Sequence, residues 1–145
     1  MSISGKPIEF VKLLVASFAT WKFHKYGFDL KGNDLSTLAN AIASSSGTIL
    51  GFLITAIALM ASVMDRDLLK NLRSTGGYKV LISGSFICAA LFLLLLTLSL
   101  SLLLPWNSHK DILLLGTVFV AVLAASSLLS TGFGLYRVII SISKK

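Results

Sequence analysis

Two long apolar runs, neither containing an ionisable side chain, constrain the fold of this chain more than any other feature. Val80–Leu104 has 25 residues and Ile112–Leu135 has 24. A helix rises about 1.5 Å per residue, so each run can cross a hydrocarbon layer of roughly 30 Å. A third run, Thr48–Met64, has 17 residues and becomes long enough when the small residues of Leu38–Gly47 are added. The sequence therefore predicts an all-α integral membrane protein.

Composition agrees with a membrane environment. Of the 145 residues, 55% are hydrophobic, and the mean hydropathy is +0.87. A water-soluble domain of this size could not bury that much apolar surface. The net charge is +7, and the charged residues lie between the apolar runs. This placement favours a role in orienting the chain in the membrane and in contacting membrane lipids over nucleic acid binding. The single cysteine, Cys88, lies inside an apolar run and is interpreted as a packing residue.

The first apolar segment, Ile8–Tyr26, is open to two interpretations. Its apolar centre, Leu13–Trp21, is short, and lysines flank it. Such a segment can lie at the membrane surface as an interfacial helix. It can also span, with Lys12 snorkelling to one surface and aromatic and basic residues near Trp21 anchoring the other.

The distribution of Lys and Arg favours four spans. With three spans, six of these residues lie on one side of the membrane and seven on the other. With four spans, nine lie on one side and four on the other. The second division is a positive-inside bias with both termini cytoplasmic. The prediction is one transmembrane domain over 1–145, with spans at about 8–26, 38–64, 80–104 and 112–140. Asp34 or Ser36 is expected to cap the second span and Pro105 to end the third.

The predicted cytoplasmic loop, 65–79, carries the largest group of charges between spans. Its first part, Asp65–Arg73, has leucines on one helix face and cations on another. The helix can lie on the inner leaflet, with its leucines in lipid, or it can be a docking platform for a cytoplasmic partner. The candidate residues for contact with lipid or a partner are Arg66, Lys70, Arg73 and Lys79.

The sequence contains no signature of an enzyme, a metal site or a cofactor site. The two histidines, His24 and His109, lie in separate predicted loops. No phosphate-binding loop and no metal-spaced Cys/His set is present. We also expect no acidic or basic residue at a depth where it could relay protons, so a pump is not predicted.

Small and hydroxylated residues recur at helical spacing in two spans, and Gly47–Gly51 forms a GxxxG pattern. Such rows allow helix backbones to approach closely. They can also line a weakly selective pore, although four helices alone cannot both enclose water and shield it from lipid, so conduction would require a homo-oligomer. The row in the second span is Ser44, Gly47, Gly51, Thr55, Ala58 and Ser62. The row in the fourth span is Ala124, Ser127, Thr131 and Gly134.

Over roughly Gly32–Lys145 the chain resembles the RexB-type phage-exclusion inner-membrane proteins of lambdoid prophages. The resemblance rests on the segments Ser44–Ile49, Leu53–Ala56, Leu72–Arg73, Gly77–Tyr78 and Leu135–Tyr136. It implies a polytopic ion channel of the bacterial inner membrane, opened by a cytoplasmic sensor of infection. Opening would depolarise the membrane and stop phage growth.

Two functions from different classes follow as hypotheses. The first is an oligomeric channel or pore that acts as the effector of an abortive-infection system. The alternative is a non-conducting membrane anchor or infection-sensor subunit that recruits a cytoplasmic protein. A small holin-like protein is a third possibility that matches the length. The long second span and the patterned loop favour the first two hypotheses over it.

Overall fold

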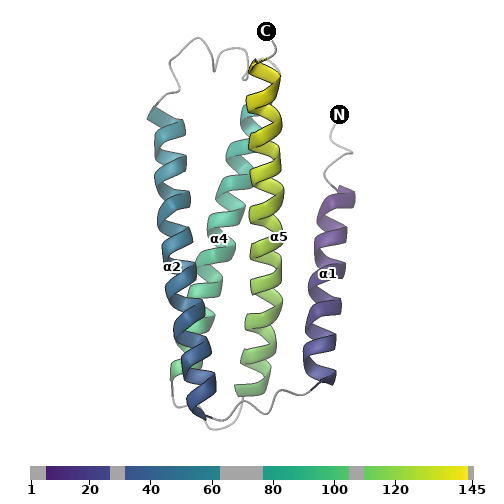
Figure 1. Ribbon diagram of the computed structural model, residues 1–145, viewed down its shortest axis with the longest axis vertical. Helices are drawn as coiled ribbons and strands as arrows, with labels where there is room; N and C mark the ends of the chain where they lie inside the picture. Colours follow the sequence, from purple (N-terminus) through teal and green to yellow (C-terminus); the bar gives the residue numbers. More distant parts are fainter. Residues whose placement is uncertain (1–5, 27–31, 63–76, 105–109, 144–145) are drawn as a thin grey trace.

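The computed structural model contains four helices arranged as a row, and it describes residues 6–26, 32–62, 77–104 and 110–143. The helices are α1 (Lys6–Lys25), α2 (Gly32–Ser62), α4 (Gly77–Leu103) and α5 (Lys110–Ser143). The described residues contain no strand, so the predicted all-α class is confirmed. The helices alternate in direction, and the start of α1 and the end of α5 point to the same end of the bundle (Figure 1).

Within the described ranges, each helix contacts only its neighbours in the order α2, α4, α5, α1. The second helix therefore does not contact α5, and α1 contacts α5 alone. This row encloses no central channel, because its two edge helices do not meet. The outer faces of α2 and α1 remain uncovered, which matters for the function proposed below.

Three helices are long and apolar enough to cross a membrane, over Asn33–Ser62, Leu81–Leu103 and Lys110–Gly134. The first helix is outside this set because Glu9, Lys12 and three basic residues at its C-terminal end lower its hydropathy. It nevertheless lies alongside α5 and not across the end of the bundle (Figure 1). It begins well below the C-terminal end of α5 in this view.

The helix ends agree with the predicted spans to within a few residues, with one exception. The second helix begins at Gly32, six residues before the predicted span, so the predicted capping by Asp34 or Ser36 is wrong. Both residues lie inside the helix, and the Ser36 hydroxyl donates back to the Asn33 carbonyl at 2.9 Å. The third predicted span ends as expected, since α4 stops at Leu103 and the residue before a proline is disfavoured in a helix.

The core consists of contacts between neighbouring helices, and the buried residues on each helix recur with heptad spacing. Steps of three and four residues bring small side chains to the contact, which allows close approach of the backbones. On α4 the buried residues are Ser85, Cys88, Phe92, Leu95, Ser99 and Leu102. On α5 they are Thr117, Val120, Ala124 and Ser127. On α2 the buried residues are Ala39 and Ser46, and the partly buried ones on the same face are Ile42, Ile49 and Leu53.

One buried hydrogen bond ties α4 to α2. The Ser99 hydroxyl donates to the Ala39 carbonyl at 2.6 Å, and both residues are fully buried. Most other hydroxyls in the described helices donate to a carbonyl of their own helix, as Ser101 does to Thr97 at 2.8 Å. The Ser99 bond therefore fixes the register between the two helices.

We expect Ser99→Ala to lower the free energy of unfolding in detergent by about 1 kcal/mol, because an interhelical hydrogen bond in a membrane protein contributes on that scale. The measurement is loss of helicity during titration with a denaturing detergent. Ser101→Ala is the matched control, since its bond lies within α4. Equal effects of the two variants would contradict a specific role for Ser99.

Candidate functional site

The predicted row on α2 lies mostly on the uncovered side of the helix. Ser44, Gly51, Thr55, Ala58 and Ser62 are all exposed. The Thr55 hydroxyl donates to the Gly51 carbonyl of its own helix at 2.9 Å. The surface formed by these five residues is called the α2 outer face below.

Gly47 is the exception in that row. A Cβ atom built on Gly47 would lie 3.3 Å from Cδ1 of Leu96, so this glycine faces α4 at close range. A Cβ atom on Gly51 would meet nothing within 4 Å. The two glycines of the GxxxG pattern therefore differ: Gly47 packs within the chain and Gly51 is free for an external contact.

The predicted row on α5 turns mainly into the chain. Ala124 is fully buried and Ser127 is 5% exposed. A Cβ atom on Gly84 of α4 would lie 3.6 Å from Oγ1 of Thr131. Gly134 is only partly buried, and a Cβ atom there would meet nothing within 4 Å. For Ala124, Ser127 and Thr131 the geometry supports helix packing over lining of a pore.

The predicted basic loop is largely outside the described residues. Arg66, Lys70 and Arg73 belong to the range 63–76, as does the amphipathic segment predicted there. Lys79 lies in the first turn of α4. The expected contact of these four residues with lipid or a partner stays a prediction.

A charged pair lies where α1 meets α5. The Lys12 ammonium donates to Oε1 of Glu9 at 2.8 Å. The Lys12 side chain is 11% exposed, whereas that of Glu9 is 66% exposed. The lysine is therefore covered by the bundle, and the carboxylate lies on its outer side.

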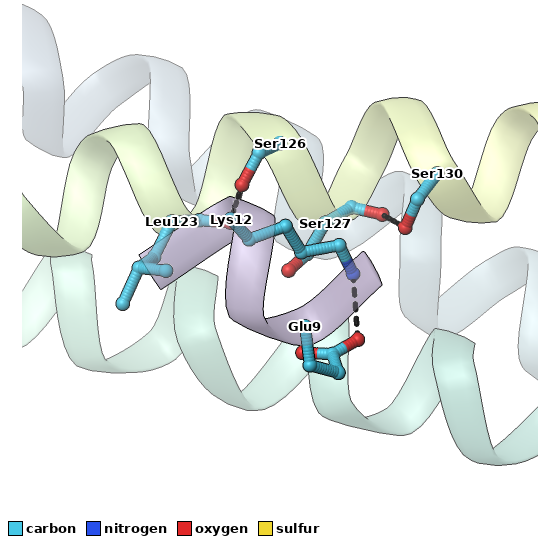
Figure 2. A network of polar contacts seen from close by, with 6 residues as sticks. All are labelled: Glu9, Lys12, Leu123, Ser126, Ser127 and Ser130. Atoms are coloured by element: carbon cyan, nitrogen blue, oxygen red, sulfur yellow. Dashed lines mark hydrogen bonds and ion pairs between the residues drawn. The ribbon is translucent and has the colours of Figure 1, made fainter. Parts of the chain in front are cut away.

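The stretch of α5 beside this pair is rich in serine. Figure 2 shows the Lys12 side chain running over the part of α5 that carries Ser126, Ser127 and Ser130. The Ser126 hydroxyl donates to the Leu123 carbonyl at 2.9 Å, and the Ser130 hydroxyl to the Ser127 carbonyl at 3.1 Å. Glu9, Lys12 and these three serines are called the charged site below.

The charged site lies within the apolar part of α5, nearer its C-terminal end. Ser127 comes 17 residues after Lys110 and 7 residues before Gly134, which is about 26 Å and 11 Å along a helix. The expectation that no ionisable residue lies at membrane depth stays a prediction. Lys12 lies on the part of α1 that runs along this stretch of α5.

Sequence reasoning missed this site because it treated Lys12 as a residue that snorkels to the surface. The side chain does extend toward the N-terminal end of α1, as snorkelling requires. It ends, however, at Glu9 one turn away and is covered by α5. One signal was available: Lys12, Ala16 and Thr20 follow at four-residue steps, and Ala16 is fully buried, which marks a packing face.

The C-terminal end of α1 carries cations stacked on aromatic rings. The Lys22 ammonium lies 5.8 Å from the ring centroid of Phe18 and 5.1 Å from that of Tyr26. The Lys25 ammonium lies 5.2 Å from the Trp21 ring centroid. Exposed Trp and Tyr beside Lys are typical of a membrane–water interface, and anchoring of this end there stays a prediction.

Two further features of the described residues bear on chemistry. No group of three or more His, Cys, Asp or Glu side chains there could hold a metal ion. A shallow apolar groove of about 390 Å³ runs along α5 and is lined by Leu128, Leu129, Gly132, Phe133 and Tyr136. Most of its wall is hydrocarbon.

No protein-family model, curated protein or solved structure matches this chain.

Proposed function

We propose that this protein is the subunit of an oligomeric ion channel in the bacterial inner membrane. It acts as the effector of a phage-exclusion system of the RexB type and depolarises the membrane when a cytoplasmic sensor triggers it. All four helices enter the bilayer in this proposal, with both termini cytoplasmic. The positive-inside bias of the four-span arrangement supports that orientation.

The observation that carries the proposal is the row arrangement with polar groups left on its outer surfaces. The α2 outer face offers exposed hydroxyls and small residues. The first helix offers the exposed carboxylate of Glu9. Glu9 lies in the first turn of α1, and a charged side chain that faces hydrocarbon is costly. These surfaces are best stabilised by other copies of the chain or by water between copies.

Leucine at Thr55 tests the α2 outer face. We expect Thr55→Leu to reduce the depolarisation that the protein causes in bacteria challenged with phage, because a larger apolar side chain blocks either assembly or the aqueous path. The measurement uses a voltage-sensitive dye in bacteria with and without phage challenge. Thr97→Leu is the matched control, since Thr97 is also exposed and bonded within its own helix, at 2.8 Å to the Leu94 carbonyl.

The outcomes separate the two classes of function. Depolarisation that Thr97→Leu preserves and Thr55→Leu lowers supports a channel that uses the α2 outer face. Depolarisation unchanged in both variants would remove that face from the conducting assembly. If the membrane potential never changes while the protein is present in the inner membrane, the non-conducting anchor or sensor replaces the channel.

A further inference from the structure

The two members of the charged pair lie about 60° apart around α1 and differ in exposure. Lys12 is 11% exposed and lies against α5, whereas Glu9 is 66% exposed. The lysine therefore holds the carboxylate in place from the protein side, and most of the carboxylate surface remains available to the surroundings. In hydrocarbon such a carboxylate is strongly disfavoured.

Polar groups beside the pair also lack partners. Lys12 has three N–H donors, and Glu9 takes one of them. Ser127 is 5% exposed, and its hydroxyl donates to no described group. Buried donors of this kind are normally satisfied by protein or water. Water beside the charged site would satisfy these donors.

We propose that the Glu9 carboxylate faces the aqueous path of the assembled protein and selects for cations. Several copies would place a ring of carboxylates around the path, and acidic rings favour cations. The inference rests on the proposed channel function, and it assigns the selective group to α1 instead of the α2 outer face.

Helix geometry supplies a matched pair of positions for the test. At about 100° per residue, Leu13 lies about 40° from Glu9 around α1, and Val11 lies about 200° away. Both are exposed, Leu13 at 48% and Val11 at 55%, and Val11 differs from Glu9 in depth by only about 3 Å. Leu13 and Glu9 thus share a face, while Val11 lies on the opposite one.

The experiment is cysteine labelling in a full-length Cys88→Ala background. Membrane vesicles carrying Glu9→Cys, Leu13→Cys or Val11→Cys are treated with a membrane-impermeant cationic methanethiosulfonate. We expect Glu9→Cys and Leu13→Cys to react and Val11→Cys to remain unlabelled. Leu13→Cys keeps the Glu9–Lys12 pair, so it reports on the path even where loss of Glu9 disturbs α1.

Either of two other patterns would overturn the inference. Labelling of all three positions would place α1 in the membrane–water interface on every side. Absence of labelling at both Glu9→Cys and Leu13→Cys would place their shared face in lipid or in a dry contact between copies.

A charge exchange tests selectivity separately. The double variant Glu9→Lys, Lys12→Glu retains an ion pair but places the cation outside. In planar bilayers under a KCl gradient, we expect the ratio of K⁺ to Cl⁻ permeability to change from above one to below one. An unchanged ratio contradicts the role of Glu9 and leaves the channel intact, whereas a protein that conducts in no form contradicts the proposed function itself.

Discussion

Replacing Gly47 by leucine should separate α2 from α4, while the same replacement at Gly51 should leave the fold of the chain intact. A Cβ atom at Gly47 already approaches Leu96 to 3.3 Å, and no such neighbour exists within 4 Å of Gly51. Extra methylene groups in a packed contact typically cost about 1–3 kcal/mol. We expect Gly47→Leu to lower the free energy of unfolding in detergent by that amount.

Gly51→Leu is the control for stability and also a test of assembly. The two glycines are four residues apart on one helix, so intrinsic helix propensity contributes equally to both variants. We expect Gly51→Leu to unfold like the unmodified protein and yet to assemble or conduct less. Equal destabilisation by both variants, measured by loss of helicity in denaturing detergent, would contradict the assignment of the two faces.

Breaking the charged pair should release α1 from α5. Lys12→Met leaves the Glu9 carboxylate without the ammonium 2.8 Å away, and Glu9→Gln leaves a lysine that is 11% exposed without its carboxylate. Removing one member of a buried pair can cost 3–5 kcal/mol. Because Glu9 is partly exposed, we expect about 1–3 kcal/mol for each single variant.

The double variant separates loss of the pair from loss of either side chain. We expect Glu9→Gln with Lys12→Met to cost clearly less than the sum of the single changes, since no unpaired charge remains. Maleimide labelling of Ala16→Cys in Cys88→Ala protein reports on release, because Ala16 is fully buried and α1 contacts only α5. Additive costs, or no gain in labelling of the single variants, would show that α1 is held by other contacts.

The sequence was sufficient to predict the three most apolar helices. Charge-free runs as long as Val80–Leu104 can satisfy their backbone groups in a bilayer only as helices. Their ends were harder to place, because polar residues such as Asn33 and Asp34 extend α2 beyond its apolar part. The row arrangement was not predicted, since hydropathy carries no information on which helices meet.

The candidate site shows the same limit. The α5 row was found because Ala124 and Ser127 follow the spacing of the buried seam. On α2, most of the small residues chosen from the sequence lie on the α2 outer face and not on the side that packs against α4. The side that contacts α4 mixes Ala39 and Ser46 with large residues such as Ile42. The covering of Lys12 depends on α5, whose serines beside the Glu9–Lys12 pair come more than a hundred residues later in the sequence.

The pairing of α1 with α5 joins the first helix of the chain to the last. Ser127 is synthesised 115 residues after Lys12, which takes roughly 6–23 s at about 5–20 residues per second. During that interval α1 has no partner from its own chain, because α2 and α4 do not contact it in the described structure. Docking of α1 on α5 therefore cannot precede the synthesis of α5, and a nascent or truncated chain lacking α5 leaves α1 without its partner.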